Sequence, residues 1–365
     1  MEKWGSKDQV ELFKFKDVTE TRVKEIFKQL KNTHSECMDG FSNKVIKISA
    51  PSLIRPMKHL INASFKTNIF PSKWKIFKLI GLYKNKGDNE SLENYRPIAL
   101  LNPFSKVLEI EIFSQMNSHM DKFKMWNKNG YAYKKHHSTI HALMDLAEVW
   151  CSNIDSNTQS VNMMLDMSCA FDLVSHDTLL EKMKIYKYDT NSIKLMKSYL
   201  SFRSQYVDIC GEKSEFLWNK HGVPQGSIMG PFLFSLYVNE LSAILNYECD
   251  HNEKVKWNDN IFGEDCSKCG VMVTFADDCT IILESMKHNS DITSSKLDKI
   301  LNSLEIFLKE NNLKLNKSKT NLIRTTTSQQ LTKNGCEKIK ISTLDSKNKP
   351  IVPKNAVQLL GLVIS

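Results

Sequence analysis

The sequence predicts an α+β fold in which short buried strands are interspersed with longer amphipathic helices. Short apolar runs have the length of strands, namely Ile76 to Tyr83, Val161 to Leu165 and the two arms of Val271 to Leu283, which are also β-branched. Apolar residues at helical spacing follow Thr19 and Ser138 and recur from Leu297 to Leu308. With 365 residues, 41% of them hydrophobic, the chain can form one large domain or two ordinary ones.

Charge and cysteine content narrow the class of protein. The net charge of +9 favours a polyanionic partner, although a solvated lysine-rich surface would give the same number. Nine cysteines form no disulfide-like framework, the start has no signal-peptide core, and no apolar run is long enough to span a bilayer. We therefore expect an intracellular protein of the cytoplasm, the nucleus or both, with reduced thiols and no membrane partner.

Several elements can be placed in order along the chain. Thr19 is expected to cap a helix that continues to about Lys31, and a further helix covers roughly Ser52 to Lys66. The helix after Ser138 is expected to bury Ile140, Leu143, Met144, Ala147 and Trp150 or Cys151. An apolar helix from Phe232 to Leu245, a basic strand from Leu313 to Ile323 and an apolar run from Val357 to Ile364 follow.

Two adjacent carboxylates, Asp277 and Asp278, lie between two apolar strand-like runs. The segment Ala276 to Cys279 is expected to form the tight turn of a hairpin. Asp is common in turns, so a solvated turn is one interpretation. The other is a divalent metal site, because Mg²⁺ is often held by one or two carboxylates together with water and substrate phosphates.

A third carboxylate, Asp166, ends the apolar strand that begins at Val161. It could instead be the N-cap of a following helix. If the two strands are neighbours, three carboxylates converge, and like charges raise one another's pKa unless cations are present. Two Mg²⁺ ions would relieve the repulsion and stabilise the attacking and leaving oxygens of a phosphoryl transfer. Such a cluster in a basic chain predicts a polymerase.

Other stretches suit a nucleic acid or nucleotide, although each could be a plain surface loop. Lys84 to Asp88 is a basic loop that leads to Asn94-Tyr-Arg-Pro97, and arginine offers bidentate donors to phosphate. Gly130 to His137 mixes aromatic and cationic residues. Bases stack on aromatic rings while cations contact the phosphate backbone, so this mixture suits a template strand. In His221 to Ser227, glycines allow the backbone to approach a ligand closely.

A polar insertion at 247–270 contains zinc-type ligands in a spacing that fits no standard finger. These ligands are Cys249, His251, Cys266 and Cys269. Plain loop thiols remain the alternative.

Six blocks in order resemble the reverse transcriptase domain of non-LTR (LINE-like) retrotransposons. They are Asn94-Tyr-Arg-Pro-Ile98, Leu165-Asp-Met-Ser-Cys-Ala-Phe-Asp172, Gly222-Val-Pro-Gln-Gly-Ser227, Phe275-Ala-Asp-Asp278, Leu315-Asn-Lys-Ser-Lys-Thr320 and Leu359-Leu-Gly-Leu362. The resemblance covers roughly residues 20–365. It implies a right-hand polymerase with fingers and an α+β palm built on an antiparallel sheet. It also implies an RNA template, a DNA primer, deoxynucleotides and two Mg²⁺ ions, with Mn²⁺ as an alternative ion.

The resemblance assigns roles to individual residues. Asp166, Asp277 and Asp278 match the catalytic metal ligands, with the backbone of Met167 as a further ligand. Phe171 matches the residue that excludes a 2′-hydroxyl, and Gln225 and Gly226 match the loop against the incoming nucleotide. Arg96, and less closely Lys106, resemble the triphosphate-binding residues, Lys319 resembles the lysine that protonates the leaving pyrophosphate, and Leu359 to Leu362 resemble the primer-grip turn.

The resemblance divides the chain into an N-terminal helical region at 1–78 and a fingers and palm domain at 79–365. Because the sequence stops at Ser365, directly after the last palm block, the thumb is expected to be missing.

Three functional hypotheses follow. The first is an RNA-directed DNA polymerase domain that transfers a nucleotide to a primer 3′-hydroxyl. The second is a truncated, inactive retroelement remnant that only binds RNA. The third is another palm polymerase, such as an intron maturase or a viral RNA-copying enzyme, and the Ala-Phe-Asp and Gly-Val-Pro-Gln-Gly blocks disfavour it. The oligomeric state is left open.

Overall fold

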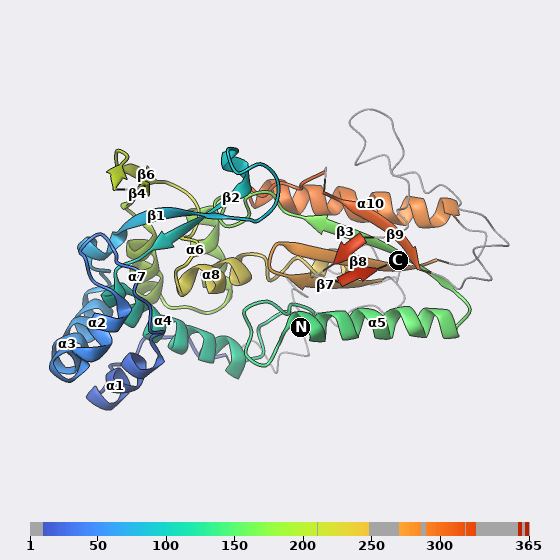
Figure 1. The fold of residues 1–365 in the computed structure, drawn as a ribbon. Helices are drawn as coiled ribbons and strands as arrows, with labels where there is room; N and C mark the ends of the chain where they lie inside the picture. The colour runs from blue at the N-terminus through green and yellow to red at the C-terminus, as the bar shows by residue number, and fades with distance from the viewer. Residues whose placement is uncertain are drawn as a thin grey trace. The chain divides into compact units, whose positions relative to one another are not determined.

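The computed structural model describes residues 10–209, 211–247, 270–285, 290–317, 319–325, 357–359 and 362–364. The chain divides into two compact units (Figure 1). One unit, here the sheet unit, contains residues 126–170 and 238–365, and the other, the helical unit, contains 5–125 and 171–237. From residue 10 onward, the chain passes from one unit to the other after Met125, after Ala170 and after Tyr237.

The sheet unit is built on four strands in the order β7–β8–β3–β9, all antiparallel. Their bounds are β3 Gln159–Asp166, β7 Val271–Phe275, β8 Asp278–Ser285 and β9 Asn321–Thr325. Strand β3 is buried along its length except at Asp166, because both faces of the sheet are covered. The predicted strands at 161–165 and 271–283 are thus confirmed, with β3 starting two residues earlier.

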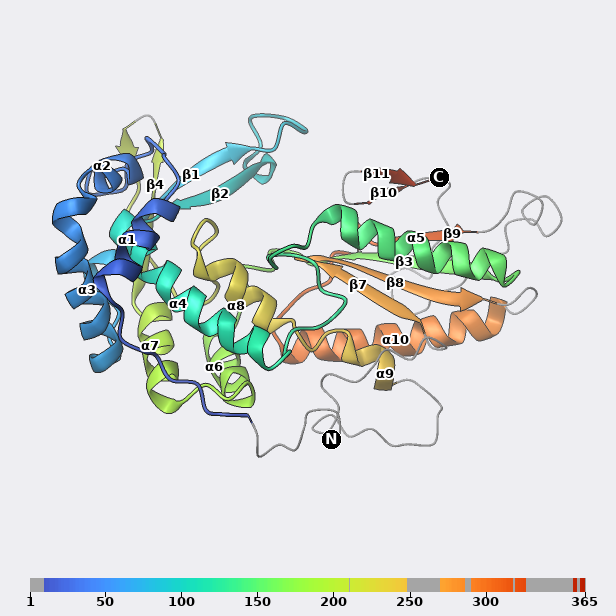
Figure 2. The same ribbon diagram turned by 90° about the horizontal axis from the view of Figure 1, so that it is seen from below.

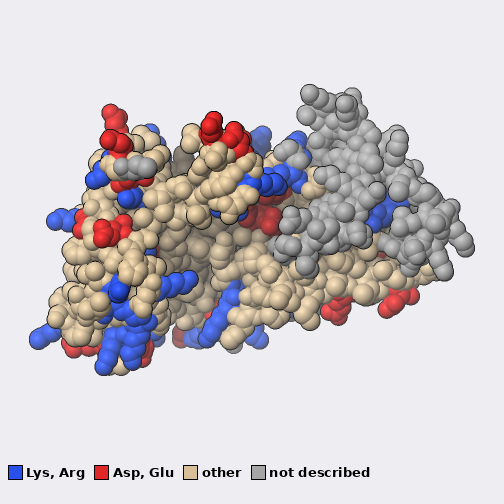
Figure 3. Space-filling model, viewed as in Figure 1, with Lys and Arg blue, Asp and Glu red and all other residues tan. Residues whose placement is uncertain are grey.

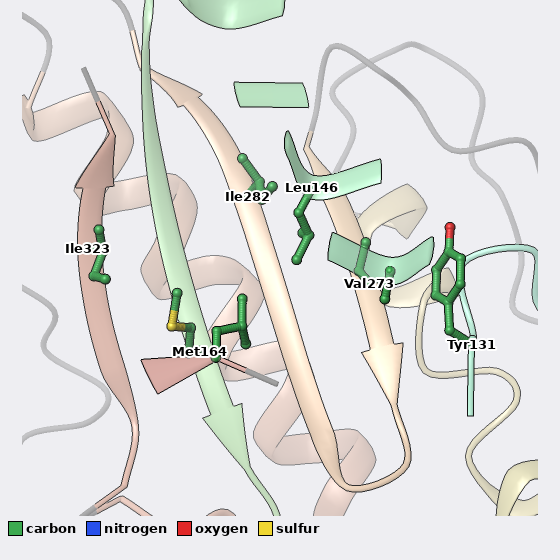
Figure 4. Close-up of a cluster of buried hydrophobic side chains, with 8 residues drawn as sticks. Tyr131, Leu146, Met164, Val273, Ile282 and Ile323 are labelled. Carbon is green, nitrogen blue, oxygen red and sulfur yellow. The ribbon is translucent and has the colours of Figure 1, made fainter. Parts of the chain in front are cut away.

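Helices cover both faces of this sheet. Helix α5 (Thr139–Asp155) lies on one face and α10 (Ser290–Glu310) on the other (Figures 1 and 2). The hairpin of β10 (Val357–Leu359) and β11 (Leu362–Ile364) lies on the α5 side, where Leu359 joins the core. That core also contains Leu146 from α5 and Met164, Val273, Ile282 and Ile323 from the four strands (Figure 4).

The predicted inner face of α5 is wrong by part of a turn. Ile140 and Met144 are exposed, whereas Ala142 and Leu146 are fully buried. Leu143 and Trp150 lie at the margin of the contact and are partly buried, as predicted. The helix is apolar over more than one stripe, so the sheet beneath it, and not the spacing alone, decides which residues face inward.

The helical unit contains a second, mixed sheet. Strand β1 (Ile76–Tyr83) pairs antiparallel with β2 (Tyr95–Leu100) and parallel with β4 (Arg203–Ile209). Two short strands, β5 (Glu212–Lys213) and β6 (Leu217–Asn219), pair with β4. Two 3₁₀ turns precede β1 and β2, η2 (Ser72–Lys75) and η3 (Leu92–Asn94). Phe77, Ala99 and Leu101 form a small core against this sheet.

Seven helices of the described residues complete the helical unit. They are α1 (Glu20–Gln29), α2 (Asn43–Ile48), α3 (Ala50–Thr67), α4 (Pro103–Lys122), α6 (His176–Ile185), α7 (Thr190–Leu200) and α8 (Met229–Tyr237), which ends at the unit boundary. Thr19 caps α1 as predicted, because its hydroxyl accepts a hydrogen bond from the backbone N–H of Arg22 at 3.2 Å. On the face in Figure 3, Lys and Arg side chains gather near α1, with Asp and Glu mixed among them.

Two element predictions are corrected. The apolar run 232–245 is not one helix, since α8 ends at Tyr237 and α9 (Ala243–Tyr247) begins after a break. The run 313–323 becomes a strand only at Asn321, because the preceding residues dock on the end of β3 as a loop. No helix of the described ranges is long and apolar enough to cross a membrane.

Candidate catalytic site

Three aspartates lie at one end of the sheet unit. Asp166 is the last residue of β3, and its partner across the ladder is Asp278, the first residue of β8. Asp277 occupies the two-residue turn between β7 and β8, because Phe275 pairs with Asp278. Ala276, the other turn residue, has a left-handed φ of 58°. A residue other than glycine in this strained backbone conformation is typical of turns at functional sites.

The N-cap interpretation of Asp166 is wrong. Asp166 belongs to the β ladder, and the next helix along the chain, α6, begins ten residues later at His176. Its cap is Ser175, whose hydroxyl accepts from the N–H of Thr178 at 3.3 Å. Asp166 therefore ends strand β3 and does not cap a helix.

Like charges oppose one another at this sheet end. Partial burial and the neighbouring charges of Asp277 and Asp166 raise the pKa of Asp278 to about 6, and the ammonium of Lys319 opposes the shift. Elevated pKa values of this kind are frequent at sites built to hold cations or protons.

Part of the predicted basic strand 313–323 docks against the end of β3. The backbone N–H of Asn316 donates to the carbonyl of Asp166 at 2.8 Å, and its side-chain amide donates to Asp166 Oδ2 at 3.1 Å. Lys319 Nζ lies 3.1 Å from the same oxygen. The structure therefore brings Lys319 to Asp166, and it adds Asn316, which is not among the predicted site residues.

Met167 directly follows β3 and forms an isolated antiparallel bridge with Leu315. The hydrogen bonds on either side join Ser168 N–H to Lys314 O and Asn316 N–H to Asp166 O. In such a pair the residue between the bonds turns its own N–H and carbonyl away from the partner strand. The Met167 carbonyl, predicted as a further ligand, is thus not used by the docked segment.

The donor chemistry of this site fits a hard divalent cation. The three side chains offer only carboxylate oxygens, and their mutual repulsion raises the pKa of Asp278, which a cation would relieve. Within the described ranges, however, the structure contains no group of three or more His, Cys, Asp or Glu already close enough to hold an ion. The carboxylates share one sheet end, and gathering all three around an ion requires side-chain adjustment.

The aromatic and basic segment at 130–137 runs beside the same hairpin. Its backbone pairs with β7 through Tyr131 N–H to Thr274 O at 2.9 Å and Thr274 N–H to Asn129 O at 2.9 Å. Burial and the nearby charge of Asp277 raise the pKa of Tyr133. The segment predicted to meet a template strand is therefore adjacent to the aspartates within the sheet unit.

In the helical unit, the Gly222–Ser227 loop folds between β2 and Phe171. The carbonyl of Gln225 accepts from Ala99 N–H at 2.7 Å, and the carbonyl of Phe171 accepts from Val223 N–H at 2.9 Å. Gly226 has a φ of 110°, and a Cβ there would lie 2.9 Å from the Ala99 carbonyl oxygen. The loop requires glycine for its backbone and for its close approach to β2.

The structure thus groups three of the predicted nucleotide-binding residues, Phe171, Gln225 and Gly226. The Phe171 ring stacks on Phe234 of α8 with centroids 4.7 Å apart. The side-chain amide of Gln225 donates to both carboxylate oxygens of Asp172 at 3.3 Å. Burial raises the pKa of Asp172, and the hydrogen bond from Gln225 opposes this shift.

The other predicted triphosphate-binding residues have different surroundings. Arg96 is exposed on β2, three residues before Ala99. Lys106 lies on α4, where burial lowers its pKa and the charge of Glu109 opposes the shift. Neither placement tests a role in binding phosphate.

Two sets of predicted residues have different outcomes. Cys249, His251, Cys266 and Cys269 lie outside the described residues, so the zinc hypothesis stays untested. In the predicted block at 359–362, Leu359 pairs with Leu362 across β10 and β11, and Leu359 is buried in the core of the sheet unit.

Sequence reasoning missed Asn316, which supplies two of the contacts to Asp166. Its signal was present, because Asn316 stands in the same block as Lys319, and asparagine can bond a backbone and a side chain together. Because Asn316 and Lys319 are three residues apart in one loop, both are candidates to bind the same anionic side chain.

Comparison with known proteins gives a consistent result. The family model described as reverse transcriptase (RNA-dependent DNA polymerase) matches residues 83–364. A probable RNA-directed DNA polymerase from transposon BS of Drosophila melanogaster is 28% identical over 302 residues, which cover 82% of this chain and 31% of the relative.

Two more relatives come from the same organism. The RNA-directed DNA polymerase from mobile element jockey is 26% identical over 224 residues, or 61% of this chain and 24% of the relative. The probable RNA-directed DNA polymerase from transposon X-element is 28% identical over 219 residues, or 60% and 24%. The chain therefore spans less than a third of the length of these relatives.

Proposed function

Because this chain belongs to the reverse transcriptase (RNA-dependent DNA polymerase) family, we propose that it extends a DNA primer by copying an RNA template. The resemblance to non-LTR retrotransposon enzymes that the six blocks carry is confirmed. The reaction itself, its template and its primer are proposed for this chain.

One observation supports the proposal most directly. Asp166 and Asp278 face each other across the β3–β8 ladder, with Asp277 in the adjoining turn and Lys319 on Asp166. An arrangement of opposed carboxylates at an exposed sheet end costs stability through repulsion. Such a cost is expected where the carboxylates hold cations during catalysis.

The proposed ligands of two Mg²⁺ ions are the side chains of Asp166, Asp277 and Asp278 and the carbonyl of Met167. Bound ions of this kind stabilise the attacking and leaving oxygens of a phosphoryl transfer. The chain's own residues orient the reactants: Asn316 fixes the direction of the Asp166 carboxylate through its amide, and Lys319 places a proton donor beside it.

We assign nucleotide binding to the loop of the helical unit. Gln225 and Gly226 would contact the deoxynucleotide, and Phe171 would exclude a 2′-hydroxyl by its bulk. Arg96 and Lys106 would meet the triphosphate, since both are cations that suit phosphate oxygens. In this assignment the sheet unit corresponds to the palm, and β1, β2 and the N-terminal helices correspond to the fingers.

The decisive experiment is primer extension by the full 365-residue chain on an RNA template, with Mg²⁺ or EDTA. We expect extension that requires Mg²⁺ and that Asp277→Asn abolishes. The matched control is Glu284→Gln, which changes a carboxylate further along β8 and should leave extension intact. A wild-type chain that binds Mn²⁺ no better than the Asp277→Asn variant in a titration by electron paramagnetic resonance would contradict the metal assignment.

The same preparation separates the second hypothesis, an RNA-binding remnant without activity. That hypothesis requires RNA binding that persists in EDTA, together with no extension. Binding to the phosphate backbone should weaken steeply with salt in either case. Extension, and not binding, is therefore the result that distinguishes the two functions.

A further inference from the structure

A buried carboxylate, Glu109 of α4, lies beneath the proposed nucleotide-binding loop. Its exposed fraction is 0%. Carboxylates are almost never fully buried unless they are paired. Glu109 Oε1 accepts from the hydroxyl of Ser105 at 2.7 Å, and Oε2 accepts from the backbone N–H groups of Ile228 at 2.9 Å and Met229 at 3.4 Å.

These backbone donors belong to the start of α8. The first N–H groups of a helix have no partner within the helix and must find one elsewhere. Ser227 supplies a local cap, because its hydroxyl accepts from Gly230 N–H at 2.7 Å. Glu109, more than a hundred residues earlier, supplies the acceptor for the other two. A carboxylate at this end also complements the helix dipole.

The opposite end of the same loop is fixed by β2. Gln225 O accepts from Ala99 N–H at 2.7 Å, and Gly226 packs on the Ala99 carbonyl. Gln225 and Gly226 therefore lie between two anchors, Ala99 on one side and Glu109 on the other. Only Gly226 and Ser227 separate Gln225 from Ile228, so a shift of the α8 start is transmitted directly to Gln225.

We propose that Glu109 is a positioning residue for nucleotide binding: its buried carboxylate fixes the first turn of α8 and thereby sets the place of Gln225 and Gly226. The claim rests on the proposed function, because it assumes that this loop meets the deoxynucleotide. Glu109 itself is not expected to touch the nucleotide, since it is fully enclosed between α4 and α8.

The chain contains a matched control for this residue. Glu111, on the same helix, is 3% exposed, but its carboxylate accepts from Arg22 at 2.7 Å and from Gln115 at 2.7 Å. Its partners join α4 to the N-terminal segment and not to the loop. Loss of Glu111 should cost stability without moving Gln225.

The test compares Glu109→Leu, Glu109→Gln and Glu111→Leu in the full chain. Leucine keeps the approximate volume and removes every acceptor. Glutamine keeps one, because its carbonyl can accept from α8 while its amide donates to the hydroxyl oxygen of Ser105. Two readouts are needed: hydrogen–deuterium exchange of the peptide spanning 222–230, and the KM and kcat for deoxynucleotide in primer extension.

For Glu109→Leu we expect exchange of 222–230 to accelerate and the KM for deoxynucleotide to rise about tenfold, as a small misplacement of a binding group can cause. Glu109→Gln should restore KM to within about threefold, and Glu111→Leu should lower the melting temperature without either change. If Glu109→Leu does not fold, Ser105→Ala, which removes one donor to the carboxylate, takes its place and should accelerate the same exchange.

Two results would overturn the proposal. One is unchanged exchange of 222–230 in Glu109→Leu, and the other is an equal rise of KM in Glu111→Leu, which would reveal a general loss of stability. Failure of the proposed function is distinct: a wild-type chain without extension removes the kinetic readout, whereas the exchange readout still decides whether Glu109 holds the loop.

Discussion

Replacement of Asp278 by asparagine should stabilise the metal-free protein while removing its activity. The carboxyl group of Asp278 faces Asp166 across the ladder, and its pKa is raised to about 6 from 3.8. A carboxyl group whose pKa is raised in the folded state binds more protons there than in the unfolded chain. Its contribution to stability is therefore full below pH 3.8 and is lost as the pH rises through about 6.

The magnitude follows from the size of the shift. A rise from 3.8 to about 6 is a difference of about 2 pKa units, which corresponds to about 3 kcal/mol at most. The side chain lies at an open sheet end where solvent screens charges, so we expect about 1 kcal/mol. Asparagine carries no charge. The free energy of unfolding of Asp278→Asn should therefore be higher than that of the wild type by about this amount at pH 7.5, and only slightly higher at pH 4.

The assay is urea unfolding in EDTA at several pH values, followed by tryptophan fluorescence, with Glu284→Gln as the control on the same strand. Added Mg²⁺ should then stabilise the wild type, because a ligand that binds only the folded state shifts the equilibrium toward it, and should have little effect on Asp278→Asn. An Asp278→Asn variant that is less stable than the wild type in EDTA at pH 7.5 would refute the repulsion on which the site assignment rests. So would a stability difference that does not depend on pH.

Three further predictions concern single side chains. Leu146→Ala should lower the free energy of unfolding by about 3 kcal/mol, because the Leu146 side chain is fully buried where α5 packs on the sheet. Urea unfolding measures this loss of stability. A loss smaller than the one caused by Met144→Ala, at an exposed position of the same helix, would contradict the packing. Burial lowers the pKa of His119, so its contribution to stability is present above pH 6.5 and lost as the pH falls below that value. The difference in unfolding midpoint between the wild type and His119→Gln should therefore shrink as the pH is lowered below 6.5. A difference that stays constant with pH would contradict this prediction. Phe171→Ala should increase incorporation of ribonucleotides relative to deoxynucleotides by about tenfold or more, measured as the ratio of kcat/KM values, and an unchanged ratio would remove Phe171 from sugar selection.

The sequence predicts best those parts of the fold that form from local patterns. The β7–β8 hairpin and β3 follow from short apolar runs that end in carboxylates, and the pairing of Asp166 with Asp278 follows once these strands are neighbours. Helix α1 begins where Thr19 can cap it. These predictions depend on interactions within a few residues, which a single sequence records directly.

Other features depend on what an element packs against. The face that α5 buries is set by the sheet, so Ile140 and Met144 are exposed although their spacing suits a core. The run 313–323 is predicted to be a strand, but Asn316 and Lys319 bind the end of β3, and strand β9 begins only at Asn321. Spacing cannot distinguish these cases, because the deciding partner lies far away in the sequence.

Glu109 is the clearest example of a residue hidden from sequence patterns, and it also indicates how such residues can be found. Nothing around it in α4 marks it, since α4 is largely buried and carries a second buried glutamate, Glu111. The indication comes from α8, where Ser227 satisfies Gly230 but leaves the N–H groups of Ile228 and Met229 without a local acceptor. A helix start with one small cap and an apolar first turn therefore predicts an acceptor from elsewhere in the fold. In this chain that acceptor is a carboxylate whose removal should affect the neighbouring Gln225 before it affects the rest of the helical unit.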